Sequence, residues 1–182
     1  MQHGPCDPCE RNRTFENLIP FLKEVGISVE TCFFTEFFMG LREGNKKEGK
    51  FPGAGDAKFV KRCQDFMKVQ LNTQEPRLVL TLGKEVPPML AALALSPKKM
   101  SDWTEAKTFF DLDKVGPVVH KVQFPGNRTT CSVVALVHPS RHYGNVKKCN
   151  RTYRTLQGHK AEYHEAEVAM VREALEQCGM GV

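Results

Sequence analysis

The run Arg77-Leu78-Val79-Leu80-Thr81-Leu82-Gly83 indicates an α/β fold. Its centre is a short series of aliphatic and β-branched residues, which is typical of a strand buried on both faces of a sheet. Gly83 ends the run, and Pro87 and Pro88 follow where the first turn of a helix tolerates proline. A buried strand that leads directly into a helix is the repeating unit of an α/β sheet.

The same alternation extends in both directions along the chain. We expect helices where apolar side chains recur at steps of three and four, over residues 14–25, 59–70 and 159–178. Short apolar or β-branched runs predict further strands at residues 31–35, 118–122 and 132–137. The pattern predicts a three-layer α/β/α sandwich, with a mainly parallel central sheet of about four strands.

Composition and length fit one globular domain over residues 1–182. Hydrophobic residues make up 41% and charged residues 26%, which excludes a disordered chain. No stretch approaches the ~20 apolar residues of a membrane helix, and no signal-peptide pattern opens the sequence. We therefore expect a protein inside the cell, in the cytoplasm or nucleus. We also expect a monomer. The net charge of +5 suits a nucleic-acid partner, although basic proteins without such a partner are also common.

Open α/β sheets bind ligands beyond the carboxyl ends of their strands. The segments that follow Thr35, Leu82 and Val137 are therefore the candidate site. The segment after Val137 reads His138-Pro139-Ser140-Arg141-His142-Tyr143-Gly144-Asn145-Val146, so an imidazole, a hydroxyl and a guanidinium follow an almost continuously apolar run. The alternative is a turn histidine whose ring is satisfied by the backbone.

His138-Pro139-Ser140 after a buried strand resembles the second signature motif of the uracil-DNA glycosylase superfamily. Residues 33–36 resemble the strand that ends in the base-recognition residue of that family. Residues 63–71 followed by 76–83 resemble its helix and the strand that ends in Leu-Gly. The resemblance covers most of residues 12–158.

The resemblance implies excision of uracil or a related base from DNA after the nucleotide is flipped out of the duplex. Negative charge builds on the departing base, and one preorganised donor to that charge is worth on the order of 3 kcal/mol. By the match, His138 would be this catalytic donor, and Thr35 and Glu36 would contact the base. Neither a cofactor nor a metal is required.

The resemblance also implies DNA contacts. Ser140 would hold a phosphate through its hydroxyl or backbone amide, and Arg141 and His142 occupy the stretch that enters the minor groove in the family. Further cations extend the positive charge: Lys147, Lys148, Arg151 and Arg154. They would add sequence-independent phosphate contacts. The alternative for these cations is an ordinary solvated face.

Two departures from the family pattern suggest other functions. The first signature motif is missing, so we expect an N-terminally incomplete domain. Glu36 stands where the family usually has Asn, and an ionised carboxylate only accepts hydrogen bonds. One alternative is a catalytically impaired DNA-binding protein of the same fold. Another is a hydrolase or transferase that acts on a free nucleotide or nucleoside.

The seven cysteines are irregularly spaced, which predicts free thiols. Some members of the superfamily hold an iron–sulfur cluster through four cysteines that begin with such a pair as Cys6 and Cys9. Cys63 resembles the position of their last ligand, whereas Met39 and Gly40 stand near the third. Since such a cluster needs all four thiolates, we expect no metal.

Overall fold

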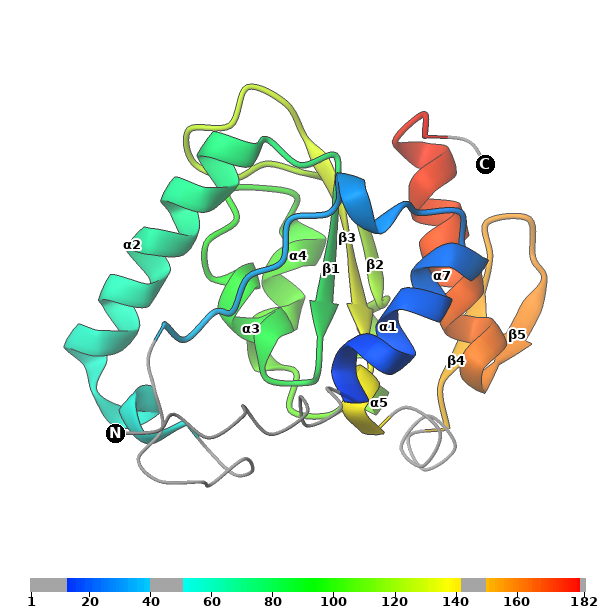
Figure 1. Cartoon of the computed structure of the whole chain (residues 1–182), viewed down its shortest axis with the longest axis horizontal. Helices are drawn as coiled ribbons and strands as arrows, with labels where there is room; N and C mark the ends of the chain where they lie inside the picture. The colour runs from blue at the N-terminus through cyan, green and yellow to red at the C-terminus, as the bar shows by residue number, and fades with distance from the viewer. Residues whose placement is uncertain (1–12, 40–50, 142–149, 181–182) are drawn as a thin grey trace, which may run out of the picture.

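The computed structural model describes residues 13–39, 51–141 and 150–180 (Figure 1). A sheet of three strands contains β1 (Leu78–Leu82), β2 (Val118–Val122) and β3 (Cys131–Leu136), in the order β1-β3-β2. All six residues of β3 are buried, as expected for the central strand. Prediction of these three strands from the sequence is confirmed, but the sheet is smaller than the predicted four strands.

The sheet is mixed and not mainly parallel. β1 runs parallel to β3, with Leu78 opposite Ser132, whereas β2 runs antiparallel to β3, with Val118 opposite Val134. Only residues 123–130 connect β2 to β3. A parallel pair needs a crossover of about a dozen or more residues, so this connection permits only the antiparallel arrangement.

Helices cover both faces of the sheet (Figure 1). Val134 and Leu136 of β3 pack with α1 (Arg13–Glu24) and α7 (Tyr163–Gln177). Val133 and Ala135 point to the opposite face, because side chains alternate along a strand. The elements on that second face are α2 (Ala57–Gln74), α3 (Val86–Ala91), α4 (Lys98–Ser101), η3 (Asp102–Glu105) and α5 (Phe109–Val115).

Most predicted helices are present, and their ends follow local chemistry. Asp56 caps α2, because its carboxylate accepts from the amides of Lys58 and Phe59. The predicted C-terminal helix begins later than expected, since β5 (Lys160–Glu162) pairs with β4 (Thr152–Arg154) in a separate hairpin. Two further 3₁₀ turns, η2 (Pro52–Gly55) and η4 (Pro139–Arg141), lie in the described part of the chain.

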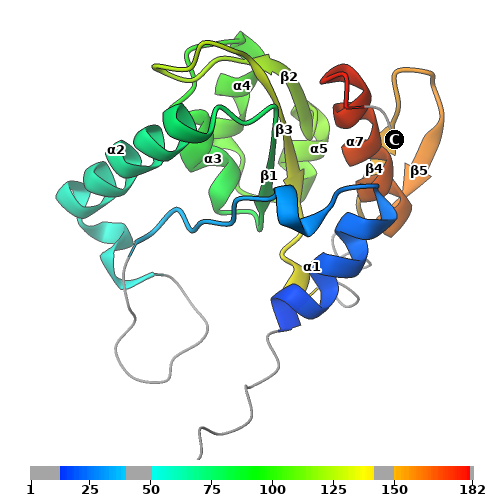
Figure 2. The ribbon, with the colours of Figure 1, turned by 45° about the horizontal axis from the view of Figure 1, so that its top comes forward.

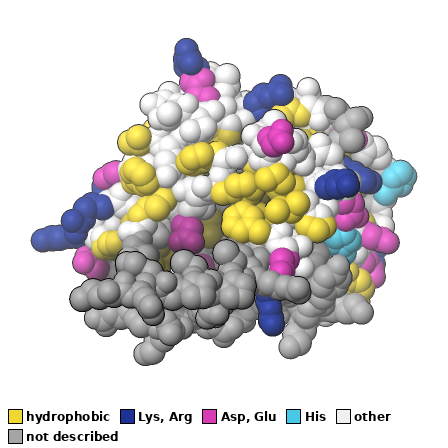
Figure 3. All heavy atoms as spheres, in the orientation of Figure 1, with side chains coloured by type: hydrophobic (Ala, Val, Ile, Leu, Met, Phe, Trp, Pro, Cys, Tyr) yellow, Lys and Arg dark blue, Asp and Glu magenta, His cyan; other side chains and the backbone are white. Residues whose placement is uncertain are grey.

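The predicted strand at residues 31–35 is wrong. A 3₁₀ turn, η1 (Val29–Thr31), is followed by extended backbone that joins no sheet within the described part of the chain. This segment runs from α1 across to α2 (Figure 2). Phe33 and Phe34 are 54% and 41% exposed, so the aromatic run is not a buried strand. Figure 3, in the orientation of Figure 1, shows exposed hydrophobic side chains gathered near the middle of the molecule.

The described cysteines, Cys32, Cys63, Cys131 and Cys178, are free thiols, as predicted. Within the described ranges, no group of three or more histidine, cysteine or acidic side chains is arranged to hold a metal. Cys6 and Cys9 lie outside those ranges. None of the described helices has the length and apolar character needed to cross a membrane.

Candidate functional site at the carboxyl edge of the parallel strands

His138 lies at the edge where the two parallel strands end. β1 ends at Leu82 and β3 at Leu136, and the amide of Gly83 donates to the carbonyl of Leu136 at 2.8 Å. A Cβ atom placed on Gly83 would lie 3.6 Å from Cβ of His138. The histidine is exposed, so its ring is accessible at the strand end where ligands bind in this class of sheet.

Ser140 fixes the tautomer of the His138 ring. The backbone amide of Ser140 donates to Nδ1 of His138 at 3.3 Å, and its hydroxyl lies 2.8 Å from the same nitrogen. Because a backbone N–H can only donate, Nδ1 must accept and carries no proton. The ring proton is therefore on Nε2, and the imidazole presents an N–H donor on that side.

The turn that carries His138 is anchored from beneath by α1. The side-chain amide of Asn17 donates to the carbonyl of Pro139 at 2.8 Å. A cavity of about 10 Å³ lies between α1, the ends of both parallel strands and this turn. That volume is roughly what one water molecule needs, so this cavity is too small for a nucleobase.

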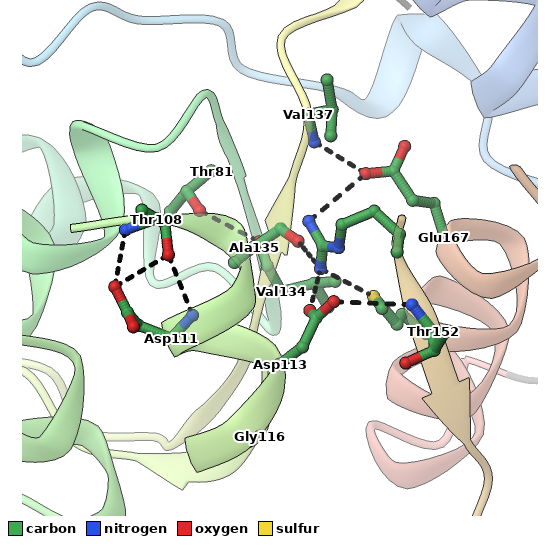
Figure 4. A network of polar contacts seen from close by, with 12 residues as sticks. Thr81, Thr108, Asp111, Asp113, Gly116, Val134, Ala135, Val137, Thr152 and Glu167 are labelled. Carbon is green, nitrogen blue, oxygen red and sulfur yellow. Dashed lines mark hydrogen bonds and ion pairs between the residues drawn. The ribbon is translucent and has the colours of Figure 1, made fainter. Parts of the chain in front are cut away.

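Arg151 is fully buried in a network of polar contacts. Figure 4 labels three of the residues that contact its guanidinium, Asp113, Ala135 and Glu167. Its guanidinium lies 3.0 Å from Oδ1 of Asp113 and 3.6 Å from Oε1 of Glu167. It also donates to the carbonyl of Ala135 at 3.0 Å and lies over the ring of Phe109, 4.7 Å from the centroid. A phosphate in solution cannot reach this side chain, so the predicted DNA contact of Arg151 is wrong.

The network holds two carboxylates and one guanidinium. Glu167 is only 1% exposed, and its Oε1 accepts from the amide of Val137 at 2.7 Å. Burial raises the pKa of Asp113 to about 6, and the charge of Arg151 opposes this rise without cancelling it. Removing one member of such a buried ion pair is strongly destabilising, because it leaves the other charge buried without a partner.

The structure does not bring Thr35 and Glu36 into the turn of His138. Both side chains are exposed, and the Thr35 hydroxyl lies 2.9 Å from Oε1 of Gln70 on α2. No hydrogen bond or ion pair joins either residue to His138 in the part of the chain that the structure describes. Of the other predicted DNA contacts, the Arg141 side chain, His142, Lys147 and Lys148 lie outside that part.

No signal in the sequence identifies the partners of Arg151. Asp113 and Glu167 each have another acidic residue two positions away, Asp111 and Glu165, and neither is a neighbour of Arg151 in the chain. Comparisons of the chain with protein-family models, with curated proteins and with solved structures gave no match in any of the three. The case for a function therefore depends on the chemistry of the site.

Proposed function

We propose that this protein is a DNA base-excision glycosylase that hydrolyses the N-glycosidic bond of uracil or a related base flipped out of DNA. The observation that carries the proposal is the His138 ring, an exposed imidazole at the carboxyl edge whose Nδ1 accepts from Ser140. The tautomer leaves Nε2–H as a neutral donor. Such a donor suits a carbonyl oxygen on which negative charge develops.

In the proposed reaction the bond between the sugar C1′ and the base nitrogen breaks, and its electron pair leaves with the base. Nε2–H of His138 donates to the base carbonyl as this charge grows. Water supplies a hydroxyl to C1′, and its remaining proton neutralises the departed base. The role of His138 is thus electrostatic, and its strength depends on how firmly the ring is held before the reaction.

DNA is the proposed partner because of charge as well as chemistry. The net charge is +5, and the chain after His138 carries Arg141, Lys147 and Lys148. Cations of this kind supply most of the sequence-independent affinity for a phosphate backbone. The hydroxyl and the backbone amide of Ser140 both point at Nδ1 of His138, so Ser140 orients the imidazole. To bind a phosphate as predicted, the Ser140 hydroxyl would have to rotate away from His138.

Glu36 favours a second candidate, a DNA-binding protein of the same fold that does not excise bases. Glu36 is exposed and, when ionised, cannot donate to a uracil carbonyl. This candidate predicts DNA binding that weakens with salt but releases no base.

The test is base release from uracil-containing oligonucleotides, single- and double-stranded, by the full chain. His138→Ala should lower the single-turnover rate by about 10²–10³-fold, the usual effect of removing one such donor. His159→Ala is the matched control, since His159 is another exposed histidine but lies in the turn between β4 and β5. We expect its rate to match the wild type.

The other outcomes of this base-release assay distinguish the candidate functions. A folded wild-type protein that binds DNA and releases no base rejects excision and supports the second candidate. Turnover of free nucleosides with no release from DNA would instead support a small-molecule hydrolase or transferase. Equal rates for His138→Ala and the wild type would remove His138 from the mechanism.

A further inference from the structure

On its β2 side, the backbone of β3 loses its strand partner just before His138, whereas β1 stays paired as far as Leu136. The amide of Ala135 donates to the carbonyl of Pro117 at 2.9 Å, and Pro117 directly precedes β2. In an antiparallel pair of this kind the two residues normally exchange both hydrogen bonds. Proline has no N–H, so Pro117 cannot return a hydrogen bond to the carbonyl of Ala135.

Two side chains take over the contacts that a longer β2 would have made. Arg151 donates to the carbonyl of Ala135 at 3.0 Å. Glu167 accepts from the amide of Val137 at 2.7 Å. The two side chains also approach each other to 3.6 Å, so they bind the strand as a unit.

We propose that the Arg151–Glu167 pair is a positioning unit that fixes the strand end presenting His138. Val137, whose amide Glu167 holds, is the residue directly before His138. The consequence for catalysis rests on the proposed glycosylase function, whereas the positioning itself does not. Neither side chain needs to touch the base or the DNA.

In the sequence, Arg151 follows residues 142–149 and is separated from them only by Asn150. Its side chain binds the strand that precedes this segment, and its own carbonyl accepts from the amide of Tyr163 at 2.8 Å. The two flanks of the segment that contains Lys147 and Lys148 are thus tied to one buried group. Displacing Arg151 would therefore disturb the strand end that carries His138.

The test compares Glu167→Leu with Glu167→Gln. Leucine removes the acceptor for Val137, whereas glutamine retains an oxygen that can accept. Glu173→Leu is the matched control, because Glu173 is a second buried glutamate of α7, 4% exposed. Its partners are Tyr153 and Leu156, in and beside β4, and His120 in the middle of β2. The substitution should cause a similar loss of stability without touching the strand end.

Two readouts do not depend on activity. We expect the Val137 amide of Glu167→Leu to exchange its hydrogen about tenfold faster or more, because the amide loses its hydrogen bond to a charged acceptor. We expect the ¹⁵N shifts of the His138 ring to move toward a mixture of tautomers. Glu167→Gln and Glu173→Leu should retain the wild-type values at both residues.

The excision assay adds the catalytic readout: Glu167→Leu should lower kcat with little change in KM for DNA, and Glu167→Gln should restore most of it. A folded Glu167→Leu protein with unchanged Val137 exchange and His138 shifts overturns the inference. If that variant does not fold, a scalar coupling between the Val137 ¹⁵N and the Glu167 carboxylate ¹³C in the wild type decides, and its absence overturns the inference. A wild type without excision rejects the proposed function but leaves these spectroscopic outcomes decisive for positioning.

Discussion

The hydroxyl of Ser140 lies 2.8 Å from Nδ1 of His138, on the same nitrogen that accepts from the Ser140 backbone amide. The hydroxyl therefore donates a second hydrogen bond to one acceptor and strengthens the preference for the Nε2–H tautomer. This arrangement makes the serine of the turn an orienting residue for the imidazole.

Ser140→Ala should lower the rate of base excision about fivefold, since it removes one hydrogen bond worth about 1 kcal/mol and retains the backbone amide. Single-turnover rates on a uracil oligonucleotide measure this. Ser101→Ala is the control, because the Ser101 hydroxyl bonds only within its own helix, to the carbonyl of Lys98. Equal rates for Ser140→Ala and the wild type would show that the backbone amide alone holds the ring.

Asp113→Asn should gain stability relative to the wild type as the pH rises. Burial raises the pKa of Asp113 to about 6, so between its ordinary value of 3.8 and 6 the folded protein binds a proton that the unfolded chain releases. The wild type is therefore favoured at low pH and loses this contribution as the pH passes through 6. Urea unfolding at several pH values between 4 and 7.5 should show a rising difference between variant and wild type.

Asp111→Asn is the contrasting variant in the same helix. Hydrogen bonds from the Thr108 hydroxyl and the Lys107 and Thr108 amides lower the pKa of Asp111. The wild type then gains stability as the pH rises through the acid range, so Asp111→Asn should lose stability relative to the wild type. Curves with the same sign for both variants would contradict the assigned causes.

Tyr153→Phe should destabilise the protein by about 1–3 kcal/mol, the usual cost of leaving a buried acceptor without its donor. The Tyr153 hydroxyl donates to Glu173, which is 4% exposed, and burial raises the pKa of the phenol and so keeps it a donor. Tyr163→Phe is the control, since Tyr163 is 43% exposed and should change by less than about 0.5 kcal/mol. Denaturant midpoints distinguish the two, and equal midpoints would contradict the contact.

Local chemistry explains which elements the sequence could predict. The strands β1, β2 and β3 were predicted because short apolar runs bounded by turns are visible without knowing their neighbours. The cap that Asp56 forms on α2 has the same local character, since a cap depends on the next three residues alone. The direction of β2 depends on its connection and its partner, which periodicity does not report.

Arg151 shows why the candidate site was harder to predict. In the sequence it is one cation among Lys147, Lys148 and Arg154, and such a run is typical of a solvated face. Its burial follows from Asp113 and Glu167, which only the tertiary fold brings to it. His138 was predictable as an edge residue because strand end and histidine are adjacent in the chain.

Gly83→Ala should destabilise the protein by about 1–2 kcal/mol, because Gly83 has φ of +91°, in the region that L-residues avoid. The space itself is adequate, since the nearest atom to a new Cβ is Cβ of His138 at 3.6 Å. Gly55→Ala is the control, as a Cβ there would meet nothing within 4 Å and its φ is not positive. Thermal unfolding should separate the two variants, and an unaffected Gly83→Ala protein would contradict the strained turn.

Replacing both Lys147 and Lys148 by glutamine should weaken DNA binding and flatten its dependence on salt. Each phosphate contact contributes about 0.9 to the slope of log affinity against log salt, so the double variant should lose about 2 from that slope. Fluorescence anisotropy with a labelled duplex between ~50 and 200 mM salt measures it. Lys160→Gln is the control, because Lys160 is already paired with Glu162 at 2.5 Å in the β4–β5 hairpin. Arg151 is inaccessible to phosphate, so Arg151→Lys should leave the slope unchanged provided that the protein folds. A slope that is equal in the wild type and the Lys147/Lys148 variant would place the DNA-binding surface elsewhere on the molecule.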